Sequence, residues 1–156
     1  MVAIEATILH WWLDTSPAGV RELWFNVSLD GIPAHHGAAF STDPSLSPAL
    51  QRMWQALNAK RADVIARYDE GYQVIELRRT AGPQTAGEIA IYSHLAQEEF
   101  PHLPWLDPMV ICIYIDPLTK ATLENLSVTV VQAPESIDLA SPAGQHRLAK
   151  LGQAGE

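Results

Sequence analysis

The sequence contains one set of side chains whose types and spacing would suit a metal ion. His94 and Glu98 lie four residues apart, so a helix would place both on one face, and His102 follows near the end of that helix. Imidazole nitrogens and carboxylate oxygens are common zinc ligands. A solvated helix face followed by a loop histidine accounts for the same pattern. We therefore expect no metal or other cofactor, and retain the metal site as an alternative.

No other motif points to catalysis. The chain has no G-x-S-x-G turn for a nucleophilic serine and no P-loop for a phosphate. The adjacent His35 and His36 would point apart on a strand. Cys112 lies in the apolar run MVICIYI, where a free thiol behaves as a small hydrophobic side chain. The sequence therefore favours a protein that is not an enzyme.

Two tryptophans are notable because strand periodicity would place them on one side of a hairpin. Residues 2–13 and 20–30 both alternate, which is typical of paired antiparallel strands. The face opposite the predicted core would carry Leu9, Trp11, Glu22 and Trp24. Aromatic side chains are enriched at interfaces, so we interpret this face as a protein-binding surface. The structural alternative is that the C-terminal tail or residues 101–108 cover it.

The composition is acidic, with 18 acidic against 10 basic residues in 156 and a formal net charge of -8. Such a balance repels phosphate backbones, so binding or mimicry of nucleic acid is a weaker alternative. Lys60, Arg61 and Arg67 are interleaved with Asp63 and other acids, which indicates a solvated helix face. The longest apolar run, residues 109–115, is too short to cross a membrane, and the start lacks a signal-peptide pattern. We expect a cytoplasmic protein without membrane contact.

Hydrophobic periodicity predicts the elements that must position these residues. Beyond the hairpin, strands are expected at residues 32–40, 72–79, 109–115 and 126–132. The main helix is expected between a capping Ser47 and Gly71, with Asp63 and Arg67 as an i,i+4 pair. A second helix is expected from a capping box at Thr85 and Glu88, although residues 86–99 also suit a strand.

This order of elements predicts an α+β fold. We expect a single domain over residues 1–140, with a mostly antiparallel sheet of five to six strands and two main helices packed on it. Residues 141–156 are expected to form a loosely ordered tail or a short helix.

These observations together predict a small acidic, non-enzymatic protein-binding module of the inhibitor, immunity, adaptor or assembly type. Its partner would be another protein or a second copy of this chain. The alternative is a small-molecule-binding protein, or a small metal-dependent enzyme with a His/Glu site in residues 80–108.

Overall fold

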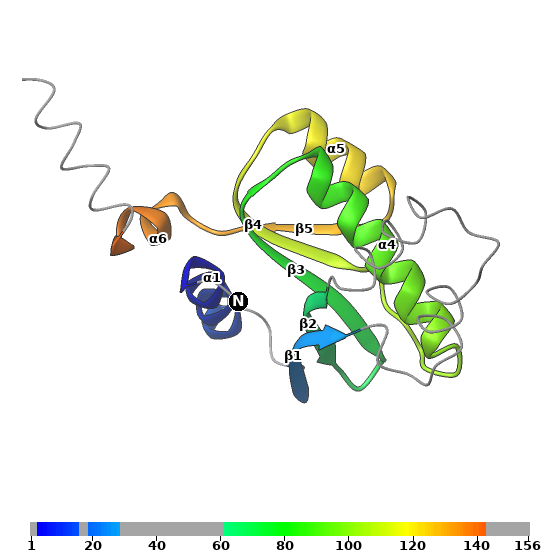
Figure 1. Ribbon diagram of the computed structural model, residues 1–156. Coiled ribbons are helices and arrows are strands. Elements are labelled where there is room, and N and C mark those ends of the chain that lie inside the picture. Colours follow the sequence, from blue (N-terminus) through cyan, green and yellow to red (C-terminus); the bar gives the residue numbers. More distant parts are fainter. Residues whose placement is uncertain (1–2, 16–18, 29–60, 143–156) are drawn as a thin grey trace, which may run out of the picture.

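The computed structural model describes residues 3–15, 19–28 and 61–142, and these contain a mixed five-stranded sheet (Figure 1). Its strands lie in chain order, β1 (Glu22–Ser28), β2 (Arg61–Arg67), β3 (Tyr72–Ala81), β4 (Met109–Ile115) and β5 (Thr129–Gln132). The first three strands are antiparallel, and β3, β4 and β5 are parallel. The α+β expectation is confirmed, but the sheet is not mostly antiparallel.

Helices cover both faces of the sheet (Figure 1). The helices α4 (Pro83–Glu99) and α5 (Pro117–Asn125) connect the parallel strands, as a parallel crossover requires, and they cover one face. The helices α1 (Ala3–Thr15) and α6 (Glu135–Leu139) lie on the other face. Each face therefore has its own apolar core, and β4 is buried between them.

The segment predicted as the first strand of a hairpin is the helix α1. Ile8, Leu9 and Trp12 are buried against the sheet, and Ile4 and Trp11 pack beside them. These positions form a helical stripe as well as an alternating pattern, so the sequence satisfied two periodicities at once. The expected hairpin does not exist, because β1 pairs with β2 instead.

The second correction concerns the main predicted helix. Its C-terminal part is the strand β2, in which Ala62, Val64, Ile65 and Ala66 are buried. Burial on both faces gave this strand an almost continuous apolar run that periodicity does not separate from a helix. The expected start of that helix at Ser47 lies outside the described residues, as do the strand expected at 32–40 and the tail from residue 143.

Several expectations are confirmed. Residues 72–79 form most of β3, β4 is an interior strand, and a helix covers residues 86–99. The cap of that helix differs from the expected box, because the Thr85 hydroxyl accepts a hydrogen bond from the backbone N–H of Gly82. Besides α1, two helices were missed: α5, which begins after Asp116 at Pro117, and the short α6, whose Asp138 receives two hydrogen bonds from Arg79.

In the described part of the chain, none of the helices is long and apolar enough to span a bilayer.

Candidate functional site

The strands β2 and β3 separate at a pair of carboxylates. The last matched pair of their ladder is Val64 and Ile75, so the same register places Asp63 opposite Glu76. There the side chains replace the backbone ladder: the N–H of Asp63 donates to Glu76 Oε1 (3.2 Å), and the N–H of Leu77 donates to Asp63 Oδ2 (3.0 Å). Both acids are thereby fixed by backbone groups at the opening of the sheet.

Arg78 joins this pair to acids from two helices. Its Nη1 lies 2.8 Å from Asp63 Oδ2, and its Nη2 lies 2.9 Å from Glu76 Oε2. Glu88 of α4 accepts a hydrogen bond from Nη2, and Glu5 of α1 lies 3.9 Å from Nη1. We call these five residues the Arg78 cluster: Glu5, Asp63, Glu76, Arg78 and Glu88. The helix α1 and the consecutive elements β2, β3 and α4 therefore meet at one guanidinium.

The cluster has an excess of negative charge. It contains four carboxyl groups and one guanidinium, so it remains acidic even if one carboxyl group is protonated. Glu76 is fully buried, and its Oε2 makes no hydrogen bond of acceptable geometry although Arg78 is close. A buried polar atom without a hydrogen bond is uncommon and marks a place where a ligand, ion or water would be favourable.

The close packing of these charged groups shifts their pKa values. Burial, together with repulsion from Asp63, raises the pKa of Glu76 to about 8. Burial opposes the charged form of Arg78, but attraction to Glu76 and the hydrogen bond to Glu88 outweigh it, and the pKa of Arg78 is raised. Burial and the neighbouring carboxylates of Glu76 and Glu88 raise the pKa of the Tyr92 phenol. Such perturbed groups gathered in one place are typical of functional sites.

A polar pocket of about 360 Å³ opens beside Arg78. It is lined by Arg78, Thr80, Gly82, Pro83, Gln84, Thr85 and Glu88. The start of α4 thus forms one wall, and the end of β3 forms the other. This pocket gives a ligand access to the guanidinium from the side of the helix N-terminus.

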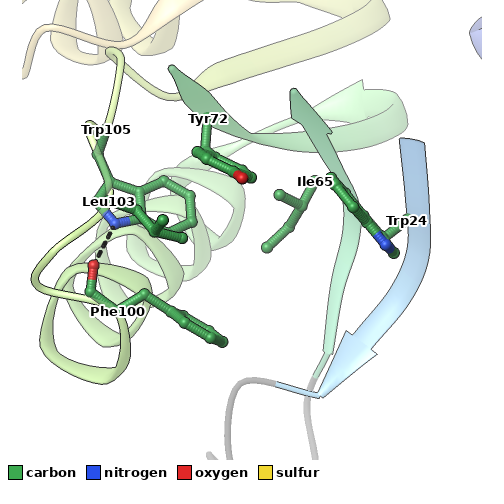
Figure 2. A pocket seen from close by; sticks show the side chains of 6 residues that line it. All are labelled: Trp24, Ile65, Tyr72, Phe100, Leu103 and Trp105. Atoms are coloured by element: carbon green, nitrogen blue, oxygen red, sulfur yellow. Dashed lines mark hydrogen bonds between the residues drawn. The ribbon is translucent and has the colours of Figure 1, made fainter. Parts of the chain in front are cut away.

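A second pocket, of about 210 Å³, lies farther along the sheet and is almost wholly apolar (Figure 2). We call it the aromatic pocket; its lining residues are Trp24, Ile65, Tyr72, Phe100, Leu103 and Trp105. The rings of Trp24 and Tyr72 are stacked with centroids 6.1 Å apart, and the centroid of the Trp105 ring lies 5.8 Å from that of Tyr72. The strands β1, β2 and β3 and the segment after α4 together build it.

The four residues of the predicted hairpin face do not form one surface. Leu9 is buried on α1, and Trp11 of the same helix is half-buried. Glu22 on β1 pairs with Arg67 of β2. Trp24 belongs to the aromatic pocket, on a different face of the sheet from α1.

The predicted metal ligands are on the exposed part of α4 and the segment after it. His94 Nε2 lies 3.1 Å from Glu98 Oε1, and both side chains are largely exposed, as is His102. Among the described residues, no group of three His, Cys, Asp or Glu side chains is placed to hold a metal ion by itself. Metal binding at these residues therefore stays a prediction, and His35 and His36 lie outside the described residues.

Sequence reasoning missed the Arg78 cluster. Asp63 was assigned to a helix as the partner of Arg67, and Glu88 was interpreted as part of a capping box. The available signal was the strand YQVIELRR, in which Glu76 and Arg78 share one side with Tyr72 and Val74. Two charged residues facing a core are costly unless a partner or a function explains them.

Comparisons with known proteins give a likeness of fold. No family model matches the chain, and no curated protein matches it. Among solved structures it resembles a repair endonuclease from Pyrococcus abyssi, with a TM-score of 0.54 and 13% identity. The match covers 83% of this chain but 46% of that one, so this chain spans less than half of that protein's length.

This likeness corrects the functional expectation. The prediction of a non-enzymatic binding module rested on an aromatic hairpin and on the lack of a catalytic pattern. The hairpin is absent, and the fold resembles that of the repair endonuclease.

Proposed function

We propose that this chain is a nuclease-type domain that acts on phosphodiesters at the Arg78 cluster. The observation that carries the proposal is the facing pair Asp63 and Glu76, fixed at the opening between β2 and β3 of a fold that resembles a repair endonuclease. The excess of carboxylates, the perturbed pKa of Glu76 and the polar pocket beside Arg78 support it.

The donor set of the cluster fits a hard divalent cation such as Mg²⁺. That ion prefers oxygen ligands, keeps several waters and is commonly held by one or two carboxylates together with substrate phosphates. Asp63 and Glu76 are two such carboxylates, and Glu76 Oε2 is buried without a hydrogen bond. Since no three His, Cys, Asp or Glu side chains among the described residues are placed to hold one metal ion together, a site that needs a full set of protein ligands does not fit.

The residues of the cluster would have different roles in the reaction. Asp63 and Glu76 would hold the cation, which when bound would neutralise the negative charge that develops on a phosphoryl group. Both terminal nitrogens of Arg78 already contact carboxylates of the cluster, so Arg78 would hold Asp63 and Glu76 in place and add positive charge near the phosphate. Glu88 contacts Arg78 from α4 and would orient it. A cation and Arg78 together would also reduce the repulsion between this acidic chain and a nucleic acid.

Cleavage of a labelled oligonucleotide by the purified chain, with and without Mg²⁺, tests the proposal. We expect Mg²⁺-dependent cleavage that Asp63→Asn and Glu76→Gln each reduce on the order of 100-fold or more, the usual scale for losing a group that stabilises developing charge. Asp69→Asn is the matched control, because Asp69 is an exposed acid paired with Arg21 away from the cluster. Absence of cleavage by the unmodified chain, or equal activity of Asp63→Asn and Asp69→Asn, would contradict the proposal.

A further inference from the structure

The aromatic pocket has an unusual lining for a surface hollow. Its accessible walls are rings and aliphatic groups, because the polar group of Trp105 is already used: its Nε1 donates to the carbonyl of Phe100 (Figure 2). Trp24 is nevertheless 38% exposed, so part of its ring remains in contact with solvent. The pocket therefore offers flat π surfaces with few hydrogen-bonding groups.

On β3, Tyr72 of the aromatic pocket and the cluster residues Glu76 and Arg78 lie on the same face of the sheet. Tyr72, Val74 and Glu76 alternate with the core residues Ile75 and Leu77 of the α1 face. Tyr72 and Glu76 are four residues apart, which on a strand corresponds to about 13 Å. At a rise of about 3.4 Å per stacked nucleotide, this distance spans about four nucleotides. The two places are therefore close enough for one short strand to contact both, although Val74 and Glu76 between them are buried.

We propose that the aromatic pocket stacks an unpaired nucleobase, so that the substrate class of the Arg78 cluster is single-stranded nucleic acid or an unpaired strand end. This inference rests on the proposed function. Every base has a flat π face, and stacking on aromatic side chains is the usual way that proteins bind single strands. A base inside a duplex already stacks on its neighbours and does not present that face.

The apolar lining also determines what the pocket does not do. Reading a base by sequence requires donors or acceptors aimed at its edge. The pocket offers few such groups: Trp105 Nε1 is engaged, Ile65, Phe100 and Leu103 have hydrocarbon side chains, and the remaining polar groups of the lining side chains are the Tyr72 hydroxyl and Trp24 Nε1. The stacking is therefore expected to tolerate all four bases.

The experiment measures binding of short oligonucleotides at low salt, using the full chain and a fluorescent adenine analogue at one position, and omits Mg²⁺ so that cleavage does not consume the probe. We expect the single strand to bind more tightly than a blunt duplex of the same sequence. Trp24→Ala should weaken single-strand binding roughly 5- to 150-fold, the factor that corresponds to about 1–3 kcal/mol for one stacked base. Trp24→Phe should restore most of that loss.

Phe25→Ala is the matched control. Phe25 is the next residue on β1 and is 51% exposed, but it lines a hollow with Leu9 and Leu13 of α1 on the opposite face. Its substitution should leave oligonucleotide binding within about twofold, because the lost ring does not contact the base in this arrangement.

The outcomes separate this inference from the proposed function. Cleavage that requires Asp63, combined with equal binding by Trp24→Ala and Phe25→Ala, overturns the stacking pocket and leaves the nuclease proposal intact. Binding that depends on Trp24 without any cleavage supports the pocket and contradicts the nuclease proposal. Equal binding of single strand and duplex, or no binding of either, overturns the inference.

Discussion

Asp63 and Glu76 exchange bonds across the opening of the sheet: Glu76 Oε1 accepts from the backbone N–H of Asp63, and Asp63 Oδ2 accepts from the N–H that follows Glu76. Backbone donors usually hold strands together, whereas here they hold two acids at the point where the strands separate. Neither acid can turn away without breaking a partly buried hydrogen bond, which costs about 1–3 kcal/mol when the donor is left unsatisfied. The position of this pair is therefore part of the fold.

The first prediction concerns the pH dependence of stability. The pKa of Glu76 is raised to about 8 from an ordinary value of 4.5, so the folded chain keeps a proton that the unfolded chain releases between these pH values. The stabilising contribution of the protonated group is complete below about pH 4.5 and is lost as the pH rises through about 8. Thermal denaturation should show a melting temperature that falls between about pH 5 and pH 8.

In the variant Glu76→Gln the side chain is neutral at every pH, so that fall should become shallower. Asp69→Asn is the control, since its exposed carboxyl group already has a lowered pKa beside Arg21 and stays ionised over this interval. Parallel curves for the unmodified chain and Glu76→Gln would show that Glu76 does not carry the effect.

The second prediction tests the charge balance of the cluster. Arg78→Gln leaves Asp63, Glu76 and Glu88 without their shared cation, and we expect a loss of about 3 kcal/mol in the free energy of unfolding, as for a broken buried ion pair. Mg²⁺ should then raise the melting temperature of Arg78→Gln more than that of the unmodified chain, because it substitutes for the missing positive charge. The exposed variant Arg21→Gln should change stability little and show no such rescue, because solvent screens that surface ion pair.

The third prediction concerns the turn beneath the aromatic pocket. Gly71 has φ +157°, and a Cβ there would lie 2.4 Å from the carbonyl oxygen of Pro104. That close approach lets the backbone of Tyr72 donate to Pro104 and accept from Leu106, which positions Tyr72 against Trp105. Gly71→Ala should therefore destabilise the chain by more than about 1 kcal/mol in chemical denaturation.

Gly87 offers the opposite case, because it lies within α4 and a methyl group added there would meet nothing within 4 Å. Gly87→Ala should raise stability by about 0.5–1 kcal/mol, since alanine loses less backbone entropy in a helix. If both glycine variants shift stability in the same direction, the close approach at Gly71 is not the cause.

The fourth prediction concerns the single cysteine. Cys112 is fully buried on β4, and burial raises the pKa of its thiol to about 11. Because the thiolate is the reactive form, iodoacetamide at about pH 8 should leave the native chain unmodified. In denaturant the same reagent should add one label, as detected by intact mass. Rapid labelling of the native chain would contradict burial of Cys112.

Local sequence patterns correctly predicted those elements in which the apolar residues followed either the helical or the strand spacing, but not both. β3 and β4 are rich in β-branched residues and bounded by turn signals, and α4 begins at a proline and has helical spacing of Ile89, Tyr92 and Ala96. The pattern failed at α1 and β2, where apolar residues satisfied two periods. Both segments are decided by what they contact: α1 packs on β3 and β4, and β2 is paired on both edges.

The sequence by itself determined the class of fold, the buried interior strand and the inert cysteine, because those depend on composition and on contacts within one segment. Only the tertiary structure decided the candidate site. Glu5, Asp63, Glu76 and Glu88 are separated by as many as 83 residues (from 5 to 88), and each one alone resembles a solvated acid or a cap. They form a candidate site because the register of β2 against β3 and the packing of α1 and α4 bring them around Arg78. Short-range sequence patterns contain no information on that register.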